Sequence, residues 1–517
     1  MPEQTGRWPL PLAWGAIALW VLAYAVLKAQ GLQGLDVDSA EQVYFAQSWQ
    51  MGYGTRQPPL YTWLLLALKP EGWAWATMLE VARYTLLCLC MAGLQAFARV
   101  CGASAREQAL VLMTHLGLSL MLWRVHDSLT HTVLAATLVT WASVAVVKSF
   151  AQPRWWLVAG ALAALACLAK FNAGLWWVAA LAVAWGLSLR VSDRGGRQCT
   201  WAWMVGGCLV FLAVLAPYGL WWLSQKMGAT TLARQIAVAR EQLPLWRPPV
   251  DVILGVLEFT LLGPALLAVI GVAAWRRLRR SPSSRPLWSL ADRWVLGQAL
   301  LALLVTVVLL MLARGSAFKA RWLWPVAPVL TVTLVLWSDR AVRACAESGL
   351  GRWPGRALWA VALAMPLLAV GVSALRWWEP ELNAQRCREC WTDRPASTLS
   401  SALHQRHGQA LRVIAGDTHL AGILAAASPR VQAWAASSSA LPPPRGFAQG
   451  PGVCVLAWVS LDATAVPPAA LRAMQEAHGE GLGALASDAW PLRHAPQRRI
   501  WLHSLRVAPA ACASASR

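Results

Sequence analysis

Three carboxylates stand close together in the segment DVDSAE, directly after the first strongly apolar stretch of the chain. They are Asp36, Asp38 and Glu41. A carboxylate held beside a membrane can serve as a general base and accept a proton from a substrate hydroxyl. The alternative is a solvated loop in which the acids cap a short helix. The neighbouring residues favour the catalytic interpretation.

Aromatic and rigid residues follow these acids. We expect four aromatic side chains to anchor short amphipathic helices at the membrane interface. They are Tyr44, Trp49, Tyr53 and Tyr61. Pro58 and Pro59 fix the chain direction, and the apolar run after them is too short to span a bilayer, so we expect an interfacial or re-entrant helix there. The loop is therefore predicted to lie rigidly against the membrane.

The rest of the chain is built to hold this loop at a bilayer. Of 517 residues, 57% are hydrophobic and only 13% are charged, and the mean hydropathy of +0.46 is too high for a protein with a wet surface. The pattern predicts a mainly α polytopic membrane bundle of about eleven transmembrane helices. The predicted spans are 10–28, 77–98, 107–123, 129–147, 155–169, 172–189, 201–223, 252–274, 294–312, 322–338 and 357–375.

The placement of the basic residues predicts the orientation. Although the formal net charge is +21, Arg and Lys fall in alternate loops, which is the positive-inside pattern rather than a nucleic-acid surface. The first apolar segment has no cleavage site of the A-x-A type and is interpreted as an uncleaved anchor. The N-terminus is then cytoplasmic, and the loop at 29–76 and the tail at 376–517 are exported to the periplasm.

The tail has a different pattern and predicts a small α/β domain. Strands are expected at RVIAGD, RVQAWA, GVCVLAWVS and RRIWLHSLRVA, with helices at THLAGILAAAS and PPAALRAMQEAHG. The predicted domains are 1–375, transmembrane, and 376–517, an accessory packing domain. Disulfides are possible among the exported cysteines, and a metal pair at the first two is a weaker alternative. These cysteines are Cys387, Cys390, Cys454 and Cys512.

The stretch DSAEQVYFAQSWQMGYGTRQPPLYTWL resembles the first outer loop of the bacterial polyprenyl-phosphate-sugar glycosyltransferases of the C type, which are related to protein O-mannosyltransferases and to the lipid A aminoarabinose transferase. Further segments match in order. They are HDSLTHTVLAATL, CLAKFNAGLWWV, FKARWLWPVAP and, in the tail, VIAGDTHLAGILAAAS. The family commonly has an Asp-Glu pair, and the alignment places Asp38 at the Asp but Ser39 at the Glu, which leaves the partner of Asp38 open.

The resemblance implies an enzyme that transfers a sugar from a polyprenyl-phosphate carrier to a lipid, glycan or protein acceptor. Asp38 would be the general base, and cations would hold the departing lipid phosphate. The leading cations are Lys170, Lys319 and Arg321. The further substrate-binding candidates are Glu41, Arg56, Gln57, Arg83 and Asp127, with Arg234 behind them. Snorkelling to the interface is the alternative role for Lys170, and helix capping is the alternative for Lys319 and Arg321.

Two other classes of site or function stay open. A divalent metal held by Asp36, Asp38, His126 and His131 is conceivable, but no spacing typical of metal ligands supports it, and no cofactor is predicted. A transporter or a flippase of lipid-linked saccharides is the alternative function, because Glu258 lies inside a predicted span. The absence of a clear twofold repeat and the large charged first loop favour the enzyme.

Overall fold

The computed structural model describes residues 9–31, 35–53, 57–126, 128–189, 194–224, 244–278, 289–313, 319–350, 353–376, 390–436, 443–461, 463, 466–477, 484–492 and 494–514. The chain forms two compact units. Unit 1 comprises residues 1–24, 56–58 and 83–373, and unit 2 comprises residues 25–55, 59–82 and 374–517. The units differ from the predicted domains because unit 2 joins the acidic first loop to the C-terminal tail.

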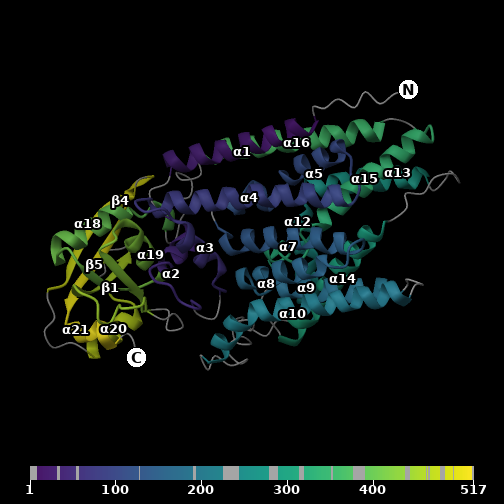
Figure 1. Ribbon diagram of the computed structural model, residues 1–517. Helices are drawn as coiled ribbons and strands as arrows, with labels where there is room; N and C mark the ends of the chain where they lie inside the picture. Colours follow the sequence, from purple (N-terminus) through teal and green to yellow (C-terminus); the bar gives the residue numbers. More distant parts are fainter. Residues whose placement is uncertain are drawn as a thin grey trace. The chain divides into compact units, whose positions relative to one another are not determined.

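Unit 1 is a bundle of helices (Figure 1). The long helices that belong to it wholly or in large part are α1 (Pro9–Gly31), α4 (Trp75–Val100), α7 (Thr130–Ser149), α10 (Arg194–Ser224), α14 (Leu290–Ala313) and α16 (Trp353–Leu375). Its shorter helices are α5 (Ala105–His115), α6 (Ser119–Leu122), η1 (Arg124–His126), α8 (Trp155–Ala169), α9 (Ala173–Ser188), α12 (Arg247–Thr260), α13 (Gly263–Leu278), η2 (Ala320–Trp322) and α15 (Leu330–Glu347).

In the described part of the chain, six helices are long and apolar enough to cross a membrane. They are Pro9–Lys28, Trp75–Val100, Thr130–Ser149, Gln198–Ser224, Leu290–Leu312 and Trp353–Leu375. Each matches a predicted span, and the predicted spans at 155–169 and 172–189 match the shorter apolar helices α8 and α9. The prediction of a mainly α, multi-pass membrane bundle is therefore confirmed.

Three predicted spans are wrong as single helices. The span at 107–123 breaks after His115, and the span at 252–274 breaks at Leu262, whose φ is 75°. Leu118 and Leu262 form an antiparallel backbone bridge, so the two breaks meet and each supplies the other with backbone partners. The span at 322–338 starts as a helix only at Leu330, because the prolines before it cannot donate helical hydrogen bonds.

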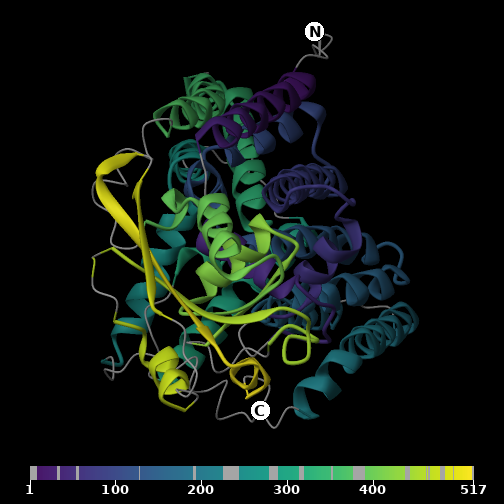
Figure 2. The ribbon, with the colours of Figure 1, turned by 90° about the vertical axis from the view of Figure 1, so that its left-hand side faces the viewer.

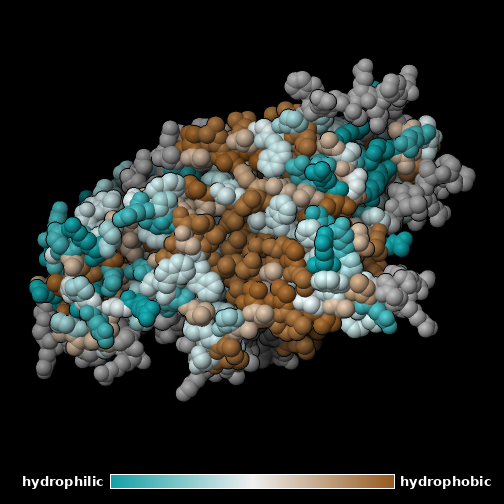
Figure 3. All heavy atoms as spheres, in the orientation of Figure 1, coloured by the Kyte–Doolittle hydropathy of each residue, from teal (hydrophilic) through white to brown (hydrophobic). Residues whose placement is uncertain are grey.

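Apolar side chains cover much of the surface of unit 1. Figure 3 shows a broad field of hydrophobic residues over its helices. Large residues on the long helices point outward, with Leu312 77% exposed and Leu367 76% exposed. Inside the bundle small residues allow close contact, since a Cβ on Gly160 of α8 would lie 2.1 Å from the carbonyl oxygen of Gly207 on α10. Such a surface is suited to lipid rather than to water.

Basic residues gather at one end of unit 1. Arg340 lies 2.7 Å from the carboxylate of Asp292, and Arg343 pairs with Glu107 and with Asp339. Nearby helix ends carry cations stacked on indole rings, because Arg106 lies over Trp359 and Arg277 over Trp353. These contacts join the start of α5, the start of α14 and the ends of α13 and α15. Several of the basic loops predicted from the sequence thus meet at the same end of the bundle.

Unit 2 contains two short helices of the first loop and the whole C-terminal domain. The helices are α2 (Val37–Phe45), α3 (Leu60–Leu68), η3 (Trp391–Asp393), α18 (Ala396–His407), α19 (Thr418–Ala427), α20 (Ala469–Ala477) and α21 (Pro509–Ser514). The strands are β1 (Leu411–Ala415), β2 (Val431–Ala435), β3 (Val453–Ser460), β4 (Ala486–Leu492) and β5 (Ala495–Val507). Their order in the sheet is β2-β1-β3-β5-β4.

The sheet is mixed, with hydrophobic cores on both faces. β1 pairs in parallel with β2 and β3, whereas β5 pairs antiparallel with β3 and β4. Figure 2 shows β4 and β5 as a long twisted hairpin in yellow. Because side chains alternate along a strand, Leu411 and Val413 face a core shared with α2, α18 and α19, and Ile414 faces a second core with α20 and α21.

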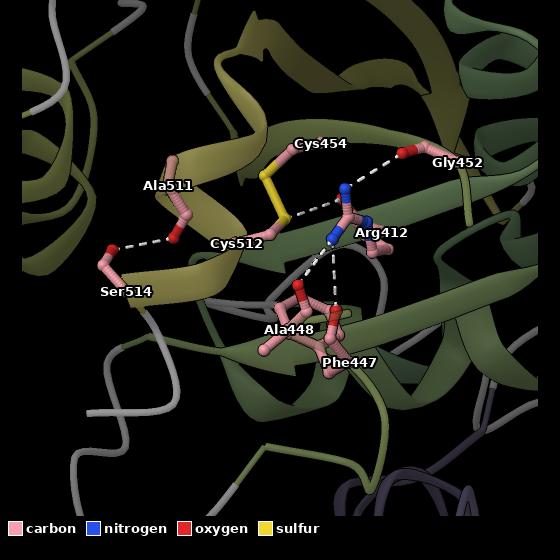
Figure 4. Close-up of a disulfide and its surroundings, with 8 residues drawn as sticks. All are labelled: Arg412, Phe447, Ala448, Gly452, Cys454, Ala511, Cys512 and Ser514. Atoms are coloured by element: carbon pink, nitrogen blue, oxygen red, sulfur yellow. Dashed lines mark hydrogen bonds between the residues drawn. A yellow bond between two sulfur atoms is a disulfide. The ribbon is translucent and has the colours of Figure 1, made fainter. Parts of the chain in front are cut away.

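The last helix of unit 2 is fixed to the sheet by a disulfide. Cys454 of β3 is bonded to Cys512 of α21, and the side chain of Arg412 lies beside the bond (Figure 4). Nη1 of Arg412 donates to the carbonyl oxygen of Ala448 at 2.9 Å. Cys390 is also disulfide-bonded, while Cys387 lies outside the described residues.

The tail confirms most of the elements predicted for it. All four expected strands and both expected helices are present, at β1, β2, β3, β5, α19 and α20. Three elements of the tail, α18, β4 and α21, were not predicted from the sequence. The segment that forms β4, ASDAWPL, contains few residues typical of strands, and it takes its conformation from pairing with β5.

Candidate functional site

The three acids of the first loop take different positions in unit 2. Asp36 is the N-cap of α2, since its carboxylate accepts a hydrogen bond from the backbone N–H of Ser39 at 3.0 Å and another from the Ser39 hydroxyl at 2.6 Å. The capping interpretation is therefore correct for Asp36. Asp38 and Glu41 lie on α2 itself, both partly exposed and three residues apart, so they lie on the same side of the helix.

The opposite side of α2 is part of the core of unit 2. Ala40, Tyr44 and Phe45 are buried among residues of α18, α19 and the sheet. Tyr53 joins the same core. The prediction that these tyrosines anchor the loop at the membrane interface is wrong, because Tyr44 and Tyr53 are each only 3% exposed. Trp49 differs from them, with 54% of its side chain exposed.

Burial changes the chemistry of these phenols. The pKa of Tyr44 lies above its ordinary value because burial disfavours the phenolate, although a hydrogen bond with the backbone of Ala435 acts in the opposite direction. Burial likewise raises the pKa of Tyr53 to about 12. Both rings stay neutral at physiological pH. They stabilise the loop by packing in the core of unit 2.

A second short helix supports α2. α3 begins directly after Pro59 and has nine residues, as expected for a segment that is too short to span. The hydroxyl of Thr62 donates to the side-chain oxygen of Gln42 at 3.0 Å, and Nε1 of Trp63 donates to the carbonyl oxygen of Gln50 at 2.8 Å. Hydrogen bonds therefore tie α3 to α2 and to the turn that follows it.

Gln57 is a further candidate of the first loop that the structure describes. Gln57 is partly exposed and directly precedes the two prolines. Arg56 lies outside the described residues, as do Asp127 and Arg234.

Arg83 lies inside unit 1 rather than at its surface. Its side chain is 2% exposed, and Nη1 donates to the carbonyl oxygen of Val125 at 3.0 Å. The hydroxyl oxygen of the next residue, Tyr84, lies 3.2 Å from Nδ1 of His126. Nε2 of His126 lies 2.9 Å from the carbonyl oxygen of Met121. Arg83 is therefore in contact with the segment that leads to Asp127.

Lys170 lies in the turn between α8 and α9, next to the start of α7. Nζ of Lys170 donates to the hydroxyl of Thr132. The preceding residue, Ala169, contacts α7 as well, because its carbonyl oxygen lies 3.2 Å from Nδ1 of His131. Lys170 is partly exposed. Its ammonium group is thus positioned by a neighbouring helix, in a residue that is partly exposed.

The same turn contacts the segment that carries the other two leading cations. Nδ2 of Asn172 donates to the carbonyl oxygen of Trp322 at 2.8 Å, which joins the α8–α9 turn to η2. Arg321 is partly exposed within η2, and Lys319 directly precedes η2 and is exposed. The structure therefore brings the Lys170 turn, η2 and the start of α7 together in unit 1. Cationic side chains on such neighbouring segments are of the type that binds phosphate groups.

The metal alternative finds no support in the part of the chain that the structure describes. No group of three or more His, Cys, Asp or Glu residues there could hold a metal ion. His126 and His131 each have a ring nitrogen within hydrogen-bond distance of a backbone carbonyl oxygen.

Long-range contacts of the first loop were not predicted. The Gln47 side chain makes two hydrogen bonds with the backbone of Ala433, His419 contacts the carbonyl oxygen of Leu35, and Gly422 packs on Ala40. Each joins the loop to residues almost four hundred positions later. Such pairings depend on the tertiary fold, and no local pattern in the sequence points to them.

Known proteins resemble this chain in sequence and in fold. No family model matches the chain. Two curated relatives from Rhizobium johnstonii are similar to it, both of them lipopolysaccharide core galacturonosyltransferases. RgtB is 26% identical over 421 residues, which are 79% of each chain. RgtA is 25% identical over 370 residues, which are 69% of each chain.

The predicted resemblance to membrane glycosyltransferases of the C type is confirmed. These relatives are glycosyltransferases, the enzyme class that the sequence predicts. The fold is also similar to that of a solved structure, ArnT. The crystal structure of ArnT from Cupriavidus metallidurans bound to undecaprenyl phosphate has a TM-score of 0.54 and 13% identity, and the match covers 95% of this chain and 98% of ArnT. The apo structure of ArnT gives the same TM-score with 14% identity, covering 98% and 99%.

Proposed function

We propose that this protein is an integral membrane glycosyltransferase that moves a sugar from a polyprenyl-phosphate donor to a lipid acceptor of the cell envelope. The observation that carries the proposal is the similarity to two lipopolysaccharide core galacturonosyltransferases over more than two thirds of the chain. The donor class is supported by the ArnT fold, since ArnT was crystallised with undecaprenyl phosphate. Glycan and protein acceptors are the other acceptor classes to be tested.

We propose Asp38 as the general base of this reaction. Asp36 caps α2 through both of its carboxylate oxygens, which is a structural role. Asp38 lies on the helix, is partly exposed, and is the residue that the family motif places at the position of the acid. The carboxylate of Asp38 takes the proton of the acceptor hydroxyl as the acceptor oxygen attacks the anomeric carbon. A new bond forms between that carbon and the acceptor oxygen. The bond to the carrier phosphate breaks, and the phosphate leaves with the bonding electrons.

The leaving phosphate gains negative charge, and we propose that the cations of unit 1 stabilise it. Lys170, Lys319 and Arg321 lie on two segments that are hydrogen-bonded to each other. A cation aimed at charge that develops in the transition state lowers the barrier more than one that binds the ground state equally well. Buried Arg83 positions the neighbouring segment, and Glu41, Arg56, Gln57 and Asp127 are proposed to contact the substrates.

The cysteines and the basic residues support an orientation in the bacterial inner membrane. Both of the described disulfide-bonded segments, at Cys390 and at Cys454–Cys512, belong to unit 2, and disulfides persist in oxidising compartments such as the periplasm. The free cysteines of the described residues all belong to unit 1. We therefore propose a periplasmic first loop and tail, with a cytoplasmic N-terminus and a cytoplasmic basic end of unit 1.

Sugar transfer by the purified protein tests the proposal. The wild type and an Asp38→Asn variant are incubated in lipid vesicles with a labelled polyprenyl-phosphate sugar and an acceptor lipid. We expect transfer by the wild type and a loss of at least about a hundredfold in the variant, because general-base catalysis typically contributes a factor of about 100 to 10,000. Asp36→Asn is the matched control, since it alters the helix cap while Asp38 is retained.

Two results would contradict this function. Transfer at the wild-type rate by Asp38→Asn would exclude Asp38 as the base. Movement of the intact labelled donor across the vesicle membrane, without transfer of its sugar, would instead establish the flippase alternative.

A further inference from the structure

We propose that the C-terminal domain positions the carboxylate of Asp38, with Gln47, His419 and Gly422 as the positioning residues. This inference rests on the proposed role of Asp38 as the general base, and it replaces the expectation that the tail is only an accessory packing domain. All of the residues involved belong to unit 2. Three separate contacts act on α2 at its C-terminal end, in its middle and just before its N-terminus.

The first contact extends the sheet through a side chain. β2 is the last strand on its side of the described sheet. Nε2 of Gln47 donates to the carbonyl oxygen of Ala433 on β2 at 2.9 Å, and Oε1 of Gln47 accepts from the N–H of Ala433 at 2.8 Å. Nε2 also donates to the carbonyl oxygen of Tyr44, the residue next to the end of α2. The amide thus acts as a short substitute for a neighbouring strand and fixes the C-terminal end of α2.

The second contact is a close approach of two helices. A Cβ on Gly422 of α19 would lie 2.0 Å from the carbonyl oxygen of Ala40 on α2, which is far too close for two non-bonded atoms. Glycine at position 422 therefore allows α2 to lie directly on α19. Ala40 is two residues from Asp38, so any displacement of α2 at this point moves the carboxylate as well.

The third contact holds the residue just before the cap of α2. Nε2 of His419 lies 2.8 Å from the carbonyl oxygen of Leu35, and a guanidinium nitrogen of Arg394 lies 3.4 Å from Nδ1 of His419. Since arginine can only donate, Nδ1 of a neutral ring is the acceptor and Nε2 carries the proton that binds Leu35. The ring packs on the indole of Trp391, with centroids 4.7 Å apart.

These contacts leave α2 little freedom. Its buried side lies in the core of the tail, and the partly exposed side carries Asp38 and Glu41. A general base must be held within hydrogen-bond reach of the hydroxyl that it deprotonates, and a displacement of about 1 Å can lower the rate about a hundredfold. The tail is therefore proposed to act on the rate of the chemical step and not on the binding of substrate.

Two variants of the full-length protein test this inference, Gln47→Leu and Gly422→Ala. Each has a matched control in the same chain. Gln409→Leu makes the same chemical change at an exposed glutamine whose side chain contacts Arg430, away from α2. Gly186→Ala adds a methyl group within helix α9, where nothing lies within 4 Å of the new atom. Glycine to alanine within a helix ordinarily stabilises it, so a loss at position 422 alone would reflect the contact with α2.

We expect kcat to fall by about 10- to 100-fold in both variants while KM changes little. The acid limb of the pH–rate profile should also shift, because it reports on the environment of the base. A variant that only folded to a smaller extent would have a lower rate at every pH, and the apparent pKa of its pH–rate profile would not shift. Hydrogen exchange of the amides of residues 37–45 should become faster, and exchange in β1 and β3 should stay unchanged. Both controls should behave as the wild type does.

The inference is overturned if exchange in residues 37–45 accelerates while kcat and the pH–rate profile stay as in the wild type. It is also overturned if exchange in that helix does not change in either variant. The hydrogen-exchange result is independent of the proposed function. If Asp38→Asn transfers sugar normally but Gln47→Leu still frees α2, the docking of α2 stands and only the catalytic role fails.

Discussion

The two units of this chain follow opposite rules for placing apolar residues. In unit 1, large apolar side chains point outward, and charged pairs such as Arg340–Asp292 are found at the helix ends. In unit 2, apolar residues fill the cores on the two faces of a sheet, and ion pairs such as Arg406–Asp488 lie at the surface. One sequence is thus suited to two solvents, lipid around the first unit and water around the second.

The first loop belongs to the same unit as the tail. From its position between the first two apolar segments, the loop is expected to belong to the membrane domain. In the structure α2 shares its hydrophobic core with the tail. The carboxylate proposed for catalysis therefore lies in unit 2, which is packed like a water-soluble domain. The cations proposed for phosphate binding lie in unit 1, which is packed like a membrane domain.

The largest expected difference between the units concerns their cysteines. Replacing Cys454 and Cys512 by serine should destabilise unit 2 by about 2–4 kcal/mol, because the bond closes a loop with a sequence separation of 58. Replacing the buried free Cys90 and Cys167 of unit 1 by alanine is the control. Thermal unfolding in detergent, with and without a reductant, measures the effect. Equal sensitivity of both units to the reductant would contradict the comparison.

A smaller effect is expected from the cations of unit 1. Lys170→Met should lower kcat/KM by about 10- to 100-fold, because it removes a positive charge from the developing phosphate, and Lys170→Arg should restore part of the loss. Lys148→Met is the control, since Lys148 lies over the ring of Trp155 and is outside the candidate site. The measurement is the steady-state kinetics of sugar transfer.

Thr132→Val separates binding from structure at this position. It removes the hydroxyl that accepts from Lys170 but keeps the charge. If Thr132→Val lowers kcat/KM as much as Lys170→Met does, the contact with Thr132 and not the charge alone accounts for the effect of Lys170.

The smallest predicted effect is a dependence of unit 2 on pH. The pKa of His419 falls to about 4, first because the ring is buried and then because of Arg394, whereas Asp417, Asp36 and the bond to Leu35 raise it. Between pH 6.5 and pH 4 the unfolded chain binds more protons than the folded one, so stability decreases as the pH falls through that window. We expect a loss of about 1 kcal/mol for the first pH unit below 6.5.

Thermal unfolding at a series of pH values measures this loss. His419→Gln should flatten the pH dependence, and His404→Gln, at a histidine that lies 3.0 Å from Ser428, should leave it unchanged. A wild-type profile that His419→Gln does not alter would show that other groups control the stability of unit 2 at low pH.

The sequence was sufficient for the membrane bundle, for most of the tail and for the short helix that follows Pro59. Those features depend on local patterns, namely long apolar runs, alternating strands and a short apolar run after Pro59. The breaks in α5–α6 and α12–α13 were missed because leucines fill both segments, although Gly263 and Pro264 were an available signal. The contact of Gln47 with Ala433 could not be predicted, since 386 residues separate the partners.

The side of the membrane on which α2 lies decides whether Asp38 can meet a periplasmic acceptor. In a background that lacks the exposed Cys199, single cysteines are introduced at Val37, which is 45% exposed beside Asp38, and at Ala151, which is exposed in the basic turn before α8. A membrane-impermeant maleimide is added to intact spheroplasts. We predict labelling at position 37 before lysis and at position 151 only after it. Labelling of position 37 only after lysis would place the carboxylate in the cytosol and contradict the proposed chemistry.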